Sequence, residues 1–336
     1  MINCIYQLIS PKIIDVKFQD IDFSKKVLIR PRFMSVCHAD LRYYNGKRKR
    51  EILEKKLPMA LIHECCGVVL RDETLNFPQG TNVVMIPNDP PSDLKPGIFE
   101  NYAENSKFLS SGSDGFMQEF IVLNPDRVVP FNFVEETVFC ISELVSVAVH
   151  AVNRFINCSH KNREKIAVFG DGSVGFLVSL ILKKIIPDAF VILIGKHTEK
   201  IRHFSFVDDS FIELHENFKF DHAFECIGNQ GSSEAIDKII NHIRPQGTVI
   251  LMGVSEEKIA VNTRNILEKG LTFIGSSRSG RKDFETAVEF LENEEFRNRV
   301  SSILSFEGSV NKINDIHKIF EKSLTIPFKL AFKWNL

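Results

Sequence analysis

Short apolar segments alternate with helix-like segments through the second half of this 336-residue chain. The apolar segments with the length and composition of buried strands are KIAVFG (165–170), AFVILIG (189–195), DHAFECIG (221–228), GTVILMG (247–253) and LTFIGS (271–276). The helix-like segments between and after them are SVGFLVSLILKKI (173–185), EAIDKIINHI (234–243) and DFETAVEFLENEE (283–295). This alternation is typical of βαβ units, in which helices cover both faces of a parallel sheet. We therefore expect a doubly wound α/β domain.

The first 130 residues have a different pattern. They contain short apolar runs broken by Pro, Gly and Asn, without long helical periods, and this predicts a compact β-rich domain. A chain of 336 residues is also longer than most single hydrophobic cores. We expect two domains, and we expect the closing segment KLAFKW (329–334) to return to the first of them.

The formal net charge of -1 gives no positive surface of the kind that binds nucleic acid or an anionic membrane. The start, MINCIYQLISPKIIDV, lacks the basic and apolar regions of a signal peptide. No apolar run approaches the ~20 residues that a membrane span needs. These features predict a cytoplasmic protein, in which the seven cysteines stay reduced.

A glycine-rich segment, Gly170-Asp171-Gly172-Ser173-Val174-Gly175, follows one predicted strand and opens a predicted helix. This is the context in which GxGxxG binds a dinucleotide. The first glycine makes a tight turn, the second lets the backbone approach a pyrophosphate, and the third allows close packing of helix and strand. The helix N-terminus favours the negative charge of the pyrophosphate. The residues predicted to bind the dinucleotide are Gly170, Gly172, Ser173, Val174 and Gly175.

The residues after the second predicted strand indicate which dinucleotide binds. NAD-type sites have an acidic residue about 20 residues past the glycines, where it binds the ribose 2′-hydroxyl. Here that position reads Gly195-Lys196-His197-Thr198, with no acid. A lysine suits the 2′-phosphate of NADPH, so we predict NADPH, with Lys196 as the main contact and with His197 and Lys200 as further contacts. The simpler alternative is that Lys196 is an ordinary loop lysine.

Polar residues interrupt three apolar segments: SVCHADLRYYNG (35–46), ALIHECCGVV (60–69) and CISELVSVAVHA (140–151). Cys37, His63 and Glu143 offer the donor types of a catalytic zinc site that keeps one position open. Asp40 is a candidate to orient the histidine, since carboxylates commonly do so in zinc sites. Because the three segments are far apart, spacing alone leaves open whether these residues bind a metal or pack inside the fold.

The order of these motifs resembles that of the zinc-containing medium-chain dehydrogenases, and in particular their polyol-type members. The resemblance implies a GroES-like catalytic domain formed by residues 1–138 and 280–336. It also implies a Rossmann NADPH-binding domain over residues 139–279, with the active site in the cleft between the two. Members of the family are usually dimers, so a homodimer is expected.

The same resemblance implies roles for individual residues. Cys37, Asp40, His63, Glu64 and Glu143 would be the catalytic residues, and one zinc ion would be bound by Cys37, His63 and Glu143. Glu64 would be a nearby or alternate ligand. Many members carry a second zinc on four cysteines, but the corresponding residues 88–108 contain no cysteine, and one zinc is therefore expected.

Longer segments resemble one branch of that family, the ribulose-5-phosphate reductases: KLPMALIHE (56–64), ENYAENSKFLSSGSDGFMQ (100–118), HFSFVDD (203–209), FDHAFECIG (220–228) and VNTRNILEKGLTFIGSSRSGRKDF (261–284). This implies an NADPH-dependent and zinc-dependent reduction of D-ribulose 5-phosphate to D-ribitol 5-phosphate. The product would feed CDP-ribitol synthesis for teichoic acid or capsule, with a cytidylyltransferase as the pathway neighbour.

Some contacts of the expected reaction stay open. The family usually has Ser or Thr two residues after the cysteine ligand, where it starts a proton relay, but this chain has Ala39. Glu64 through a water, His38 or a nearby tyrosine are the candidates to replace it. Arg278, in GSSRSG, suits a cofactor or substrate phosphate and is grouped here with the cofactor residues. Arg42 and Lys107 are further candidates for the sugar phosphate.

Two other functions compete with this interpretation. One is a polyol dehydrogenase that acts on unphosphorylated sugars with NAD, and Lys196 together with the missing acid argues against it. The other is an NADPH-binding regulator without catalytic activity, and the retention of every candidate zinc ligand argues against that.

Overall fold

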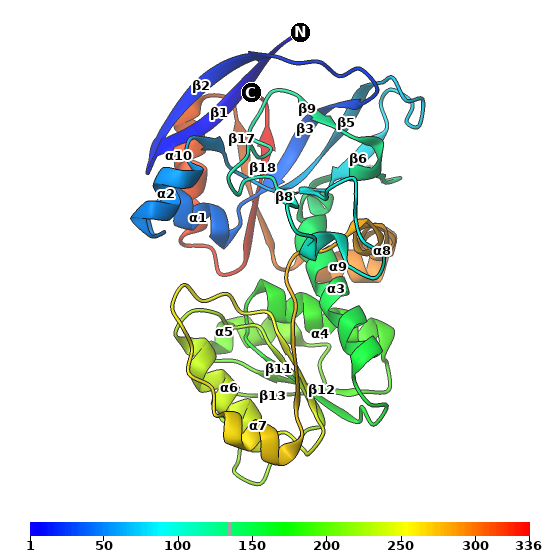
Figure 1. Cartoon of the computed structure of the whole chain (residues 1–336), viewed down its shortest axis with the longest axis vertical. Helices are drawn as coiled ribbons and strands as arrows, with labels where there is room; N and C mark the ends of the chain where they lie inside the picture. Colours follow the sequence, from blue (N-terminus) through cyan, green and yellow to red (C-terminus); the bar gives the residue numbers. More distant parts are fainter. Residues whose placement is uncertain (134–135) are drawn as a thin grey trace. The chain divides into compact units, whose positions relative to one another are not determined.

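The computed structural model describes residues 1–133 and 136–336. The chain forms two compact units, one of residues Met1–Ser146 and Arg278–Leu336, and the other of residues Val147–Ser277 (Figure 1). The boundaries between the units therefore lie at 146/147 and 277/278, whereas the sequence places them at 138/139 and 279/280. The first boundary falls inside helix α3 (Ser142–Cys158).

The second unit contains a parallel sheet in the order β13-β12-β11-β14-β15-β16. This is the strand order of a doubly wound nucleotide-binding fold. The strands that the sequence predicted are all present, and the structure adds the short β13, which the sequence did not predict. The strands are β11 (Lys165–Phe169), β12 (Phe190–Ile194), β13 (Asp209–Phe211), β14 (His222–Glu225), β15 (Thr248–Leu251) and β16 (Thr272–Gly275).

Helices cover both faces of this sheet. Figure 1 shows α4 and α5 on one side of the strands and α6 and α7 on the other. Because both faces are covered, the central strands are mainly apolar and buried, as parallel strands usually are. The helical segments are α4 (Ser173–Ile185), α5 (Thr198–Ile201), the 3₁₀ segment η4 (Arg202–Phe204), α6 (Gly231–His242) and α7 (Thr263–Lys269).

The first unit is built mainly from antiparallel strands. Its described strands form sheets in the orders β2-β1-β4, β10-β6-β5-β3-β18-β17 with β9 beside β3, and β7-β8. The strands are β1 (Ile2–Ser10), β2 (Ile13–Asp20), β3 (Val27–Ser35), β4 (Met59–Ala60), β5 (Glu64–Asp72), β6 (Asn82–Met85), β7 (Asn88–Asp89), β8 (Lys107–Phe108), β9 (Ile121–Leu123), β10 (Val128–Pro130), β17 (Leu304–Val310) and β18 (Lys329–Trp334).

Strand β18 pairs antiparallel with β3, so the closing segment does return to the first unit, as predicted. Helices α1 and α10 pack through Tyr44, whose ring stacks on Phe320 with centroids 4.5 Å apart. The helical segments of this unit are α1 (His38–Tyr44), α2 (Arg50–Lys56), α8 (Arg281–Glu292), α9 (Glu294–Ser301), α10 (Ile313–Ser323) and the 3₁₀ segments η1 (Glu100–Tyr102), η2 (Pro125–Arg127) and η3 (Glu136–Ile141).

Among the described residues, one helical stretch is long and apolar enough to cross a membrane by length and composition, namely Thr137–Cys158. This finding corrects the expectation that no such segment occurs. Its most apolar window is 78% buried inside the structure, as expected for the core helix of a globular protein. The stretch therefore gives little support for a membrane span.

His222, at the start of β14, is a buried base that the fold keeps neutral. Its Nε2 donates to the carbonyl oxygen of Asn162, and its Nδ1 accepts the backbone N–H of Thr248, both at 3.0 Å. Burial, and next the charge of His160, lower the pKa of His222 to about 4. An unfolded histidine titrates near 6.5, so the unfolded chain binds a proton between these pH values that the folded chain does not.

We expect the free energy of unfolding to decrease as the pH falls from about 6.5 to about 4, with His222 contributing about 2–3 kcal/mol of this decrease. Urea denaturation followed by circular dichroism at several pH values measures it. The His222→Gln variant cannot titrate and should depend less on pH over this interval, whatever its stability at neutral pH. Equal pH dependence in the two proteins would contradict the assignment.

Candidate active site

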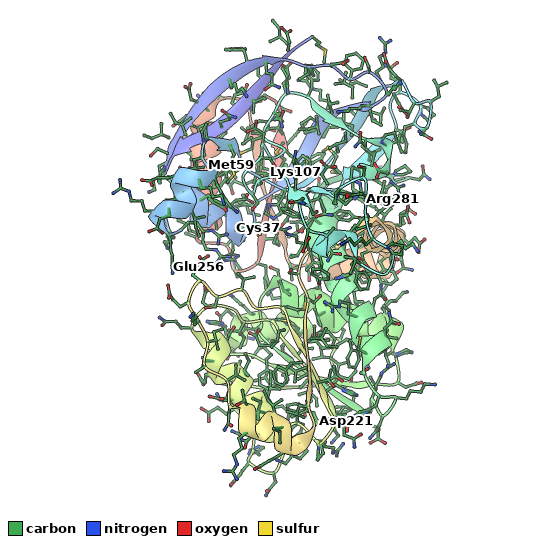
Figure 2. The ribbon with its side chains drawn as sticks, in the orientation of Figure 1. Cys37, Met59, Lys107, Asp221, Glu256 and Arg281 are labelled. Carbon is green, nitrogen blue, oxygen red and sulfur yellow. The ribbon has the colours of Figure 1, made fainter. Side chains whose placement is uncertain are left out.

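Cys37 is held at the beginning of α1 by a carboxylate one turn along the helix. Cys37 is the N-cap residue with an extended backbone, and its N–H donates to Asp40 Oδ2 at 3.2 Å. This is the reciprocal arrangement of a capping box, which fixes the turn that enters a helix. The thiol is therefore presented from a defined turn, and Figure 2 labels Cys37 in the first unit.

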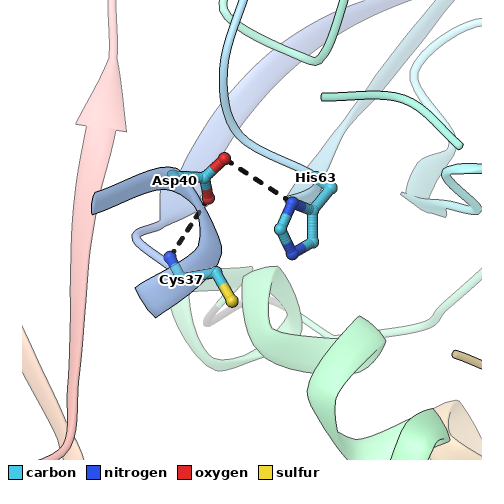
Figure 3. Close-up of side chains that lie close together, drawn as sticks. All are labelled: Cys37, Asp40 and His63. Carbon is cyan, nitrogen blue, oxygen red and sulfur yellow. Dashed lines mark hydrogen bonds and ion pairs between the residues drawn. The ribbon is translucent and has the colours of Figure 1, made fainter. Parts of the chain in front are cut away.

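The other oxygen of Asp40 organises the segment before β5. Oδ1 accepts the backbone N–H of Ile62 at 3.1 Å and the hydroxyl of Ser110 at 2.6 Å, and it lies 3.6 Å from His63 Nδ1 (Figure 3). Ile62 has a φ of 70°, a left-handed conformation that is strained for a β-branched residue. Asp40 thus supports the strained backbone that places His63.

The imidazole of His63 is buried between acidic groups. Burial lowers its pKa, but the charges of Asp40 and Cys37 outweigh that effect and hold the pKa well above its usual value. Because Nδ1 faces Asp40, Nε2 is turned away from it (Figure 3). Ligand atoms of Cys37, Asp40 and His63 all lie within 4.8 Å of one another.

His63 also belongs to a second group of potential ligands. Ligand atoms of His63, Glu64 and Glu143 lie within 4.8 Å of one another. Glu143, in the first turn of α3, is 7% exposed. Burial raises its pKa to about 7, against the lowering effect of His63. All the predicted ligands therefore lie around one imidazole.

The donor atoms fit a zinc ion. Zinc takes thiolate sulfur, imidazole nitrogen and carboxylate oxygen, and in catalytic sites it leaves one position for substrate. A ligand histidine commonly has a carboxylate beside its other ring nitrogen, as Asp40 is placed here. A divalent cation would also supply the positive charge that a buried carboxylate such as Glu143 lacks.

Glu64 differs from the other candidate ligands because it already has a cationic partner. Its Oε1 accepts from Lys329 Nζ at 2.6 Å, and its Oε2 accepts the hydroxyl of Ser35 at 2.8 Å. Lys329 also donates to the carbonyl oxygen of Val36 at 2.9 Å. Both charged side chains are buried. Lys329 was not predicted as a site residue, although a lysine at the start of the apolar segment KLAFKW is a signal for a buried charge.

The glycine-rich turn in the second unit has the geometry that its motif predicts. Gly170 has a φ of 124°, and a Cβ on Gly175 would lie 1.9 Å from the carbonyl oxygen of Gly170. A Cβ on Gly172, the N-cap of α4, would meet nothing within 4 Å. The third glycine thus allows close packing, and the second faces open space at a helix N-terminus. Ser173 and Val174 form the first turn of that helix.

Asp171, within this turn, organises the segment after β12. Its Oδ2 accepts the backbone N–H groups of Lys196 and His197 at 2.7 Å each, and it lies 3.0 Å from His197 Nδ1. The Lys196 ammonium is exposed and lies 3.4 Å from Glu234 Oε2. Asp171 therefore links the glycine turn to Lys196 and His197, the predicted contacts of the 2′-phosphate. The role of Asp171 was not predicted from the sequence.

Arg278 was grouped with the cofactor residues, but its contacts are in the first unit. Its guanidinium lies over the ring of Phe108, 4.6 Å from the centroid. The other predicted cofactor residues, including Lys196, belong to the second unit.

Comparison with known proteins gives matches over the whole chain. Residues 24–133 match the alcohol dehydrogenase GroES-like domain, and residues 197–293 match the zinc-binding dehydrogenase family. The ribulose-5-phosphate reductase of Streptococcus pneumoniae is 51% identical, covering 100% of this chain and 98% of the relative. That of Bacillus spizizenii is 44% identical, covering 100% of each. The crystal structure of Staphylococcus aureus TarJ in complex with NADPH is similar with a TM-score of 0.88 and 39% identity, covering 100% of each chain.

Replacing Lys329 by Met would leave the Glu64 carboxylate buried without its counter-charge. We expect the free energy of unfolding to fall by about 3–5 kcal/mol. Urea denaturation followed by the fluorescence of Trp334, the single tryptophan, reports on the strand that carries Lys329.

The double variant Glu64→Gln, Lys329→Met removes both charges and should recover a large part of the lost stability, because no unpaired charge remains. If the double variant is as unstable as Lys329→Met alone, loss of packing rather than an unpaired charge explains the effect.

Proposed function

We propose that this chain, which belongs to the ribulose-5-phosphate reductase family of zinc-containing dehydrogenases, reduces D-ribulose 5-phosphate to D-ribitol 5-phosphate with NADPH. Membership of this family confirms the resemblance found in the sequence, and with it a GroES-like domain combined with a Rossmann fold. The observation that carries the proposal is the group of sulfur, nitrogen and oxygen donors around His63.

The metal role is assigned to Cys37, His63 and Glu143, with Glu64 as the additional carboxylate beside them. The chemistry that zinc supplies in such a site is polarisation of a carbonyl oxygen. Asp40 would orient the His63 ring so that Nε2 is available as a ligand. Lys329 would balance the charge of Glu64, and it thereby limits the negative charge that the carboxylates concentrate around the ion.

The cofactor role is assigned to the second unit. NADPH supplies a hydride from C4 of its nicotinamide. The backbone of Gly170, Gly172 and Gly175, with Ser173 and Val174, would bind the pyrophosphate at the N-terminus of α4. Lys196 and His197 would bind the 2′-phosphate, on a segment whose backbone Asp171 fixes.

The product hydroxyl also needs a proton. Ala39 has no hydroxyl to start the relay that the wider family uses. Of the replacements considered, His38 is exposed at the beginning of α1, whereas Glu64 is buried and bonded to Lys329 and Ser35. The contacts of Glu64 favour His38 over Glu64 as the group that exchanges protons with water.

We further propose that the protein works in the cytoplasm as a homodimer and that its product is used by a cytidylyltransferase for CDP-ribitol synthesis, toward teichoic acid or capsule. These proposals rest on the resemblance to the reductase family. Size-exclusion chromatography with light scattering tests the dimer.

The main experiment follows NADPH oxidation with D-ribulose 5-phosphate, before and after treatment with a zinc chelator. We expect the chelator to abolish turnover, while NADPH binding, measured by its fluorescence, changes less than about threefold, since the cofactor residues lie in another unit. Restored turnover on adding zinc is the control. Full activity without zinc would contradict the metal role.

The same assay separates the competing functions. Faster turnover with NAD and unphosphorylated polyols would identify a polyol dehydrogenase. NADPH binding without turnover by the zinc-loaded protein would identify a regulator.

The assignment of Lys196 is tested by cofactor preference. Lys196→Ala should raise the KM for NADPH about tenfold, because one charged contact to the 2′-phosphate is lost, and should change the KM for NADH little. Lys238→Ala is the matched control. Like Lys196, Lys238 pairs with Glu234, at 2.7 Å, but it lies on α6 together with Glu234. Equal increases for NADPH and NADH would overturn the assignment.

A further inference from the structure

Arg278 lies next to the proposed metal ligands. Its guanidinium packs on Phe108 at 4.6 Å, and the ring of Phe108 contacts the ring of His63, with centroids 5.4 Å apart. These residues all belong to the first unit. Phe108 therefore contacts both the guanidinium of Arg278 and the imidazole of a proposed ligand histidine.

The charge of Arg278 is not neutralised by a close partner. With the residues that the structure describes, Arg278 makes no hydrogen bond or ion pair, and its guanidinium packs on the ring of Phe108. Neighbouring arginines are paired, Arg281 with Glu285 at 2.8 Å and Arg127 with Glu100 at 2.9 Å. An unpaired guanidinium near the proposed metal ligands is a ready partner for an anion.

The surroundings of Arg278 make its charge costly. Burial lowers the pKa of Arg278, and the charge of Glu143 only partly opposes this. The backbone is also strained, since Arg278 has a φ of 56°, in the left-handed region that is unfavourable for a residue with a long side chain. Such strain persists where the surrounding structure imposes it, and it is concentrated at functional sites.

We propose that Arg278 binds the phosphate group of the sugar phosphate and so selects phosphorylated substrates. This inference rests on the proposed function and deepens it. A zinc ion held by the proposed ligands would polarise the C2 carbonyl of the sugar, and the dianionic phosphate at the other end of the sugar needs a cation with several donors. The planar guanidinium offers paired N–H groups that match phosphate oxygens.

The contacts favour the substrate over the cofactor as the partner of Arg278. The cation lies beside Phe108, in the unit that carries the proposed metal ligands. The residues assigned to the 2′-phosphate, Lys196 and His197, belong to the other unit. The proposal thus assigns Arg278 to the substrate, whereas the sequence groups it with the cofactor residues.

The test compares Arg278→Asn and Arg278→Lys with the unmodified protein. Asparagine tolerates the left-handed backbone and removes the charge, whereas lysine keeps the charge without the planar fork. The matched control is Lys282→Met, since Lys282 is an exposed cation four residues along the chain from Arg278. A further variant, Lys107→Met, removes the other sugar-phosphate candidate, next to Phe108 in sequence (labelled in Figure 2). Each zinc-loaded protein is assayed with D-ribulose 5-phosphate and with unphosphorylated D-ribulose, at saturating NADPH.

We expect Arg278→Asn to lower kcat/KM for D-ribulose 5-phosphate about 100-fold, as expected for losing charged hydrogen bonds. The value for D-ribulose should change much less, and the KM for NADPH should stay the same. Inorganic phosphate should compete with the sugar phosphate in the unmodified protein and do so about tenfold more weakly in Arg278→Asn. Arg278→Lys should lie between Arg278→Asn and the unmodified protein, and Lys282→Met should resemble the unmodified protein.

Other results overturn the proposal. An equal loss with both sugars, accompanied by loss of bound zinc, would show that Arg278 acts on Glu143. A rise in the KM for NADPH in Arg278→Asn would show that Arg278 binds the cofactor. A loss of the preference for the phosphorylated sugar in Lys107→Met alone would show that Lys107 binds the substrate phosphate. If the unmodified protein does not reduce D-ribulose 5-phosphate, the proposed function fails. In that case, direct titration with inorganic phosphate, compared between the unmodified protein and Arg278→Asn, still decides whether Arg278 binds phosphate.

Discussion

The Asp40 carboxylate connects three segments of the first unit that are distant in sequence. It accepts hydrogen bonds from the backbone of Cys37, the backbone of Ile62 and the hydroxyl of Ser110, and it lies beside the His63 ring. Burial alone would raise its pKa, but the charge of His63 and these hydrogen bonds lower it. A buried carboxylate with so many donors stays ionised. The Asp40 charge therefore fixes the first turn of α1, the strained backbone before β5 and the orientation of the His63 imidazole.

A second buried charge pair supports the other side of the site. Lys329 on β18 meets Glu64 at the beginning of β5, and both strands pair with β3. Removing two charges from water is costly unless their hydrogen bonds are satisfied, and Ser35 and the carbonyl of Val36 satisfy them here. The pair therefore specifies where β18 must lie. It also distinguishes Glu64, whose charge Lys329 balances, from Glu143, which has no hydrogen-bonded cation among the described residues.

Much of the fold was predictable because its signals are local. The apolar runs of β11, β12, β14, β15 and β16 and the helix α4 are visible in the sequence, as is the glycine turn between β11 and α4. Strand β13 was missed because its three residues, Asp209–Phe211, include two polar side chains and have no strand-like pattern. The apolar stretch through α3 was underestimated because polar residues interrupt it.

The site was predictable in part. Residue types at Cys37, His63 and Glu143 indicated a metal, but only the fold shows that they lie around one imidazole. Lys329 and Asp171 were missed because their partners, Glu64 and the backbone of Lys196 and His197, are far away in sequence, and such pairing has no local signature. Arg278 was predicted to bind a cofactor or substrate phosphate, and its position on Phe108 required the structure.

The first unit is interrupted by the second, since residues Val147–Ser277 lie between its two parts. A ribosome therefore completes the nucleotide-binding segment before it makes β18, which pairs with β3. Domains tend to fold during synthesis as soon as their chain is available. Until Lys329 emerges, the nascent chain carries Glu64 without its counter-charge and β3 without its partner β18, so the first unit is expected to finish folding last.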